Sequence, residues 1–211
     1  MTVARPRALL LDYVGVLTPD VAASCAAFER AVGIPEGRCF DLLVADGRDD
    51  PQGGVIGALE RGEITTASFE WRLRWLLEDD GWAPPAGPML PGLFAQVRPS
   101  GRLWDVAAQV RAAGVPTGVV SNSWGLAMYP RAYLDERFDV QVISGEVGLR
   151  KPDPAIFELA AAWLGIPPGE GVFVDDHTRN VAAARQVGMT ALHHEGDDAA
   201  TASRLRSLFD V

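Results

Sequence analysis

The sequence predicts an α/β protein whose core is a parallel, doubly wound β-sheet. Short apolar runs alternate with segments in which apolar residues recur at helical spacing, and this alternation is typical of parallel sheets. Several apolar runs end directly in polar residues, which in open α/β sheets lie at the edge where ligands bind. The strands are predicted at residues 8–11, 117–120, 138–143, 171–174 and 189–192.

The first strand ends in a carboxylate. The apolar residues 8–11 run directly into Asp12, and Gly15 permits a sharp turn soon afterwards. An aspartate that only begins a turn would look the same, but three later stretches repeat the arrangement. We therefore treat Asp12 as a candidate for chemistry at the carboxyl edge of the sheet.

A block of helical segments interrupts the strand pattern after this turn. Glycine and proline residues separate the segments and cluster again at residues 84–92. A helical insertion directly after the first strand lies beside that strand's C-terminal end, where a lid over a ligand has to be. We predict a core of residues 1–18 and 95–211 and a helical cap of residues 19–94, with helices at 21–32, 39–45, 55–59 and 67–79.

The second half of the chain alternates helices and strands regularly. Apolar residues at helical spacing within residues 101–114 predict the helix before the second strand, which ends in the polar pair Ser121 and Asn122. The third strand is followed by a glycine-containing loop that places Lys151 just before a helix, and Asp153 is a suitable N-cap for that helix.

The fourth strand ends in two adjacent acids, Asp175 and Asp176. A helical stripe follows before the fifth strand, and residues 195–211 are predicted to form a last surface helix. Four strand ends therefore direct polar residues toward one edge of the predicted sheet.

Composition excludes some classes of partner. The net charge is −9 and no cluster of basic residues is present, which argues against nucleic acid and against an anionic membrane surface. A small anion held by local donors is compatible with this charge. The two cysteines suit a reducing, cytoplasmic environment, and neither a signal peptide nor a membrane-spanning stretch is recognisable.

Four stretches in order resemble the motifs of the haloacid dehalogenase superfamily of hydrolases. They are LLLDYVGVLT, GVVSNS, GLRKPDPAIF and VFVDDHTRNVAAARQVGM, and together they extend over nearly the whole chain. Each is a weak match alone, whereas the ordered set is specific. The resemblance implies a Rossmann-like core and a helical cap inserted after the first strand.

The resemblance also implies a magnesium-dependent reaction. Asp12 would attack phosphorus and carry it as an aspartyl-phosphate. Mg²⁺ would offset the repulsion between this carboxylate and an anionic substrate. The metal would be held by the side chains of Asp12, Asp175 and Asp176 and by the backbone carbonyl of Val14.

Further residues match positions that bind phosphate in the superfamily. Ser121 and the backbone of Asn122 would hold phosphoryl oxygens, and Lys151 would neutralise the charge that phosphate shares with the nucleophile. Asn180 resembles the residue that steadies the metal-binding loop. The implied activity is that of a phosphatase or phosphotransferase acting on a small phosphorylated metabolite, in a monomer or homodimer.

Val14 departs from the superfamily pattern. Most phosphatases of this type have a second aspartate at this position, which protonates the leaving oxygen, and its loss removes a contribution of about 10²- to 10⁴-fold. One alternative is therefore a non-catalytic regulatory protein that binds phosphate and Mg²⁺. Another is a 2-haloacid dehalogenase, whose relatives have tyrosine at this position and lack the paired acids of the fourth motif.

Overall fold

The computed structural model describes residues 5–211 and contains a five-stranded parallel sheet with the order β3-β2-β1-β4-β5. The central strand β1 is completely buried, because neighbouring strands flank both of its edges and helices cover both faces. This explains its uninterrupted apolar sequence. The strands are β1 (Ala8–Leu11), β2 (Thr117–Ser121), β3 (Val140–Ile143), β4 (Gly171–Asp175) and β5 (Thr190–His193).

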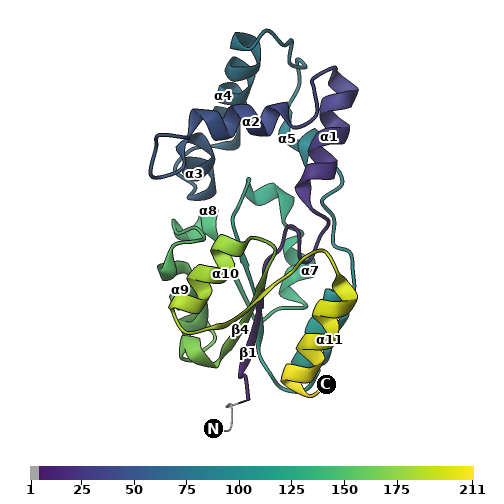
Figure 1. Cartoon of the computed structure of the whole chain (residues 1–211), viewed down its shortest axis with the longest axis vertical. Helices are drawn as coiled ribbons and strands as arrows, with labels where there is room; N and C mark the ends of the chain where they lie inside the picture. Colours follow the sequence, from purple (N-terminus) through teal and green to yellow (C-terminus); the bar gives the residue numbers. More distant parts are fainter. Residues whose placement is uncertain (1–4) are drawn as a thin grey trace.

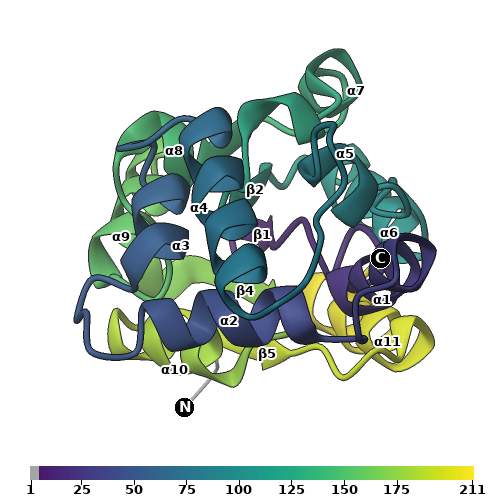
Figure 2. The same ribbon diagram turned by 90° about the horizontal axis from the view of Figure 1, so that it is seen from above.

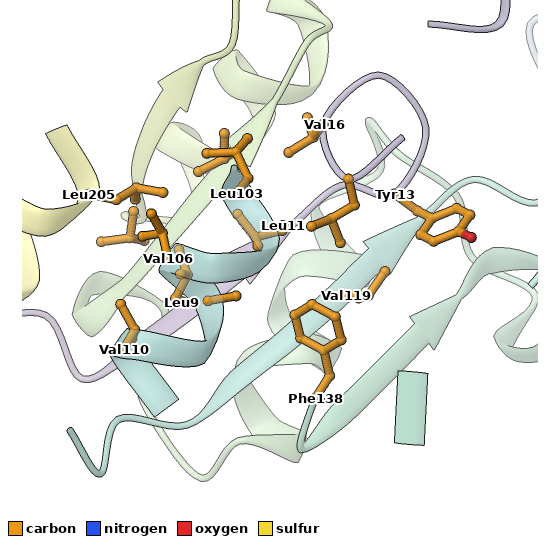
Figure 3. Packing of buried hydrophobic residues seen from close by; sticks show 14 of the residues in the cluster. Leu9, Leu11, Tyr13, Val16, Leu103, Val106, Val110, Val119, Phe138 and Leu205 are labelled. Atoms are coloured by element: carbon orange, nitrogen blue, oxygen red, sulfur yellow. The ribbon is translucent and has the colours of Figure 1, made fainter. Parts of the chain in front are cut away.

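Two hydrophobic clusters lie on opposite faces of the sheet, and alternate residues of β1 contribute to each. Leu9 and Leu11 belong to the cluster beneath α6 (Leu103–Ala112) and α11 (Asp198–Phe209), which Figure 3 shows in close view. Ala8 and Leu10 belong to the cluster beneath α9 (Pro154–Trp163) and α10 (Thr178–Gln186). The parallel α/β architecture predicted from the sequence is confirmed.

The signals read from the sequence explain where several helices begin. The side chain of Asp153 accepts a hydrogen bond from the Ala155 backbone N–H at the start of α9, and Pro154 occupies the first helical position. Asp197 likewise caps α11. β3 begins at Val140, two residues later than predicted, because the Phe138 N–H is bonded to Leu134 at the end of α7 (Arg131–Asp135).

The helices that follow β1 form a separate group beyond the carboxyl edge of the sheet (Figures 1 and 2). They share a hydrophobic cluster of their own, whose buried members include Leu43, Phe69, Leu73 and Leu77. We call this group the helical block. It comprises α1 (Val21–Val32), α2 (Arg38–Asp46), α3 (Gly54–Glu60), α4 (Thr66–Asp79) and α5 (Leu90–Leu93).

The helical block contacts the sheet-bearing part through a loop and a short helix. Trp124, in the loop after β2, places its ring 5.5 Å from the rings of both Phe69 and Phe94 in the block. α3 packs near α8 (Ser144–Val147), which follows β3. The boundaries predicted for a cap, residues 19 and 94, stay a prediction.

The remaining elements are two short 3₁₀ helices, η1 (Leu126–Met128) and η2 (Pro168–Glu170). Within residues 5–211, every helix is too short or too polar to cross a membrane.

Candidate active site

Three neighbouring strands bring their polar ends together at one edge of the sheet. Asp12 follows β1 directly, Ser121 ends β2 and Asp175 ends β4, and β1 pairs with both of the other strands. Lys151 reaches the same place from the loop between α8 and α9. Asp12, Lys151 and Asp175 are thus in direct contact, and Ser121 ends the strand beside β1.

Lys151 lies between two of the carboxylates. Its Nζ is 2.8 Å from Asp12 Oδ1 and 2.7 Å from Asp175 Oδ2, and its side chain is only 1% exposed. Burial opposes the charged ammonium, but the two carboxylates outweigh this effect and raise the pKa of Lys151 above its usual value. The lysine therefore stays a cation inside the site.

Asp12 carries an excess of negative charge in its surroundings. Burial raises the pKa of its carboxyl well above the usual value, the charges of Asp175 and Asp176 raise it further, and Lys151 opposes them. The backbone N–H of Tyr13 also donates to Asp12 Oδ1 at 2.6 Å. Lys151 therefore only partly offsets the burial of Asp12 and the charges of Asp175 and Asp176.

Groups at the start of α10 hold Asp175, the last residue of β4, in place. Asn180, in the first turn of α10, directs its Nδ2 to both carboxylate oxygens of Asp175 at 3.0 and 3.1 Å. The backbone N–H of His177 donates to Asp175 Oδ1 at 2.8 Å. Asn180 thus contacts a residue of the predicted metal-binding loop.

Asp176 reaches across to the loop after β1. A Cβ atom on Gly15 would lie 2.3 Å from Asp176 Oδ2, and Gly15 has a φ of +83°, so only glycine fits there. Asp176 Oδ1 is 2.8 Å from Nδ1 of His177, and this hydrogen bond is the main cause that raises the pKa of His177 to about 9.

The donor set fits a hard divalent cation. Ligand atoms of Asp175, Asp176 and His177 lie within 4.8 Å of one another. Two of these residues are predicted ligands, and their carboxylate oxygens are the donors that Mg²⁺ prefers. Asp12, the third predicted carboxylate ligand, is engaged by Lys151 instead. A cation of charge +2 would also balance the excess negative charge around Asp12.

The polar residues after β2 are used partly for internal contacts. Ser121 Oγ lies 2.8 Å from the hydroxyl of Tyr129. The side chain of Asn122 bridges the backbone of Lys151: Nδ2 donates to the Lys151 carbonyl at 3.0 Å, and Oδ1 accepts from the Lys151 N–H at 2.8 Å. Asn122 therefore holds the backbone of Lys151 in place through its side chain.

A family model described as haloacid dehalogenase-like hydrolase matches residues 6–188. The chain belongs to this hydrolase family. Its sequence is 29% identical to mouse acyl-CoA dehydrogenase family member 10 over 87% of this chain and 17% of that protein. It is 33% identical to phosphoserine phosphatase of Thermus thermophilus over 56% of this chain and 51% of the phosphatase. The chain therefore spans between a sixth and about half of the length of these two relatives.

The fold agrees with this assignment. A haloacid dehalogenase family enzyme of Bacteroides thetaiotaomicron, solved in complex with magnesium and inorganic phosphate, superposes with a TM-score of 0.67. The superposition covers 91% of this chain and 96% of the other at 20% identity. At this level of identity the similarity establishes the shared fold alone.

In this haloacid dehalogenase-like hydrolase, the residues next to Asp12 present apolar groups. Val14 packs against the hydrophobic cluster beneath α6 and α11. Tyr13 is fully buried, and its ring lies 5.1 Å from that of Tyr129.

One charged residue near Lys151 could not be predicted from the sequence. Glu60, the last residue of α3, is buried, and its Oε2 lies 2.7 Å from Arg150 Nε and 3.2 Å from Asn122 Nδ2. Burial is the main cause that raises the pKa of Glu60, while Arg150 and Lys151 oppose it. An acid at the end of a short helix is ordinary surface composition, so the sequence held no signal for this role.

Proposed function

We propose that this hydrolase is an Mg²⁺-dependent phosphatase or phosphotransferase that acts on a small phosphorylated metabolite through an aspartyl-phosphate on Asp12. The observation that carries the proposal is the buried ammonium of Lys151 between Asp12 and Asp175, at the carboxyl ends of two adjacent strands. A buried cation beside a carboxylate favours an incoming anion and opposes the effect of burial on that carboxylate, so it favours the ionised form that attacks.

The reaction requires one bond to form and one to break at phosphorus in each step. An Asp12 oxygen attacks phosphorus while the bond to the leaving oxygen breaks, and water or another acceptor then displaces the aspartate. Lys151 neutralises charge shared by the phosphoryl group and Asp12, and Ser121 with the Asn122 backbone would hold phosphoryl oxygens. Mg²⁺, when bound, supplies further positive charge between carboxylates and phosphate.

The metal would be held by the side chains of Asp12, Asp175 and Asp176 and by the backbone carbonyl of Val14. Asn180 supports this assignment because it fixes both oxygens of Asp175. The phosphoserine phosphatase among the relatives and the magnesium–phosphate complex among the structural neighbours are consistent with it. The helical block, as a cap of residues 19–94, would shield the phosphoryl group from bulk water.

A non-catalytic phosphate- and Mg²⁺-binding protein is the second candidate function. The observation that favours it is the packing of Val14 against the hydrophobic cluster, because valine neither donates nor accepts a proton. A 2-haloacid dehalogenase is less favoured, since the acid pair Asp175 and Asp176 is present and valine replaces tyrosine.

Phosphate release from a panel of sugar, nucleotide and acyl phosphates tests the proposal. The native protein and Asp12→Asn are compared with Mg²⁺ and with a chelator, and Asp79→Asn, an exposed acid of α4, serves as the matched control. We expect release that needs both Mg²⁺ and Asp12. Mg²⁺-dependent rates unchanged in Asp12→Asn would contradict the nucleophile, and a native protein that binds phosphate without releasing any would favour the second candidate.

A further inference from the structure

Glu60 joins the helical block to two loops of the candidate active site. Glu60 is the last residue of α3 and is only 6% exposed, although its side chain carries a carboxylate. A buried carboxylate is costly unless it is paired, so its partners show what the position is used for. Those partners are Arg150 and Asn122, which flank or contact Lys151.

Arg150 makes the first connection. Its Nε is 2.7 Å from Glu60 Oε2, and its Nη1 donates to the carbonyl of Gln52 just before α3 at 3.2 Å. A Cβ atom on Gly53 would lie 2.4 Å from Arg150 Nη1, and one on Gly57 would lie 2.9 Å from it. The glycines of this segment therefore let the arginine lie directly against the backbone of the helical block.

Asn122 makes the second connection. Its Nδ2 donates to both Glu60 Oε2 and the Lys151 carbonyl, while its Oδ1 accepts from the Lys151 N–H. The carboxylate of Glu60 accepts hydrogen bonds only, so it favours the amide orientation in which Nδ2 faces Glu60 and Oδ1 faces the Lys151 N–H. Glu60 thereby reinforces the orientation that the Lys151 carbonyl and N–H also require, and it anchors the Asn122 side chain from the helical block.

The backbone of Glu60 makes a third connection. Ser144 Oγ donates to the Glu60 carbonyl and accepts a hydrogen bond from the Ser123 N–H at 2.8 Å. One residue of the helical block thus touches the loop after β2 and, through Arg150 and Ser144, the segment after β3. Asn122 comes from the first of these segments and Lys151 from the second.

We propose that Glu60 is a positioning residue: docked through Arg150, it orients Asn122 and thereby places Lys151 for its contact with Asp12. This inference rests on the proposed function. The inference couples the docking of the helical block to the position of Lys151, so that Lys151 is correctly placed only while Glu60 is docked.

The test combines Glu60→Ala, Glu60→Gln, Asn122→Ala and the double variant Glu60→Ala/Asn122→Ala. Phosphate release with Mg²⁺ is measured on a substrate that the native protein uses. We expect Glu60→Ala and Asn122→Ala each to lower kcat by about tenfold or more. Glu60→Gln retains an acceptor for Asn122 and should lose less than Glu60→Ala. Glu63→Gln, an exposed acid paired with Arg61, is the matched control and should behave as the native protein does.

The double variant distinguishes positioning from independent effects. If Glu60 acts through Asn122, the double variant is no slower than Asn122→Ala alone, whereas multiplied losses would overturn the inference. Thermal unfolding of each variant gives the folded fraction, and rates are expressed per folded molecule. A kcat per folded molecule that is unchanged in Glu60→Ala would also overturn it. If Glu60→Ala does not fold, Glu60→Gln replaces it, and the kcat of Glu60→Gln/Asn122→Ala is compared with that of Asn122→Ala in the same way.

A second readout does not depend on activity. Lys151 is the only lysine in the chain, so isotope-labelled lysine gives one side-chain NMR signal from within the protein. We expect this signal to shift in Glu60→Ala and Asn122→Ala and to stay in place in Glu63→Gln. A native protein without phosphatase activity whose lysine signal responds in this way would overturn the proposed function alone. An unmoved signal in an active protein would overturn the role of Glu60 alone.

Discussion

Lys151 Nζ lies 2.8 Å from Asp12 Oδ1, and both residues are buried. Removal of the ammonium would leave two carboxylates, those of Asp12 and Asp175, without their cation. We therefore expect Lys151→Met to lower the free energy of unfolding by about 3–5 kcal/mol, which urea denaturation measures. Lys151→Met/Asp12→Asn should recover part of this loss, because one of the unpaired charges is gone. Equal urea midpoints for the native protein and Lys151→Met would contradict the ion pairs.

Asn180 gives a prediction about metal affinity. Its Nδ2 approaches both oxygens of Asp175, and outer contacts of this kind orient a metal ligand. Asn180→Ala should raise the Mg²⁺ concentration needed for half-maximal activity by about 10- to 100-fold. Arg179→Ala, which removes an exposed neighbour on the same helix, should leave that concentration unchanged. If the two variants titrate alike, Asn180 has no such role.

Predictions from the sequence agree best with the structure where local signals decide the structure. The helix predicted at residues 21–32 coincides with α1, because Asp20 caps its start and Gly33, with φ of +75°, ends it. The carboxyl ends of β1, β2 and β4 could be located for the same reason, since each buried apolar run stops at a polar residue. These strand ends carry Asp12, Ser121 and Asp175.

The contacts between segments that are distant in the sequence could not be predicted. Glu60 and Arg150 are far apart along the chain, and only the docking of α3 beside the loop before α9 brings them together. The contact of Ser121 with Tyr129 depends in the same way on the path of the chain after β2. Helix α7 is a single short turn of helix, too brief for a periodic pattern to reveal it.

The two cysteines provide a pH-dependent prediction. Burial raises the pKa of the Cys39 thiol to about 12 and that of Cys25 to about 11. Because the thiolate is the reactive form, a raised pKa leaves less of it at pH 8, about 100-fold less for Cys25 than for a thiol of pKa 9.0. Iodoacetamide should therefore alkylate both thiols of the folded protein slowly, and both should react rapidly in urea. Folded-state rates equal to those of free cysteine would contradict this burial.

Val14 allows the missing proton donor to be tested directly. General acid catalysis matters most when the leaving oxygen is a poor leaving group, whereas an acyl phosphate departs without a proton. Val14→Asp should therefore raise kcat on simple alkyl phosphates by about 10²-fold and change acyl phosphate hydrolysis much less. Val14→Asn has nearly the same shape without a titrating acid, and we expect it to give no such gain. An equal gain on both substrate types, or an equal gain from Val14→Asn, would show that the added group acts by packing or binding. If the native protein releases no phosphate and Val14→Asp does, the native protein is instead a binding protein whose phosphatase chemistry one carboxylate restores.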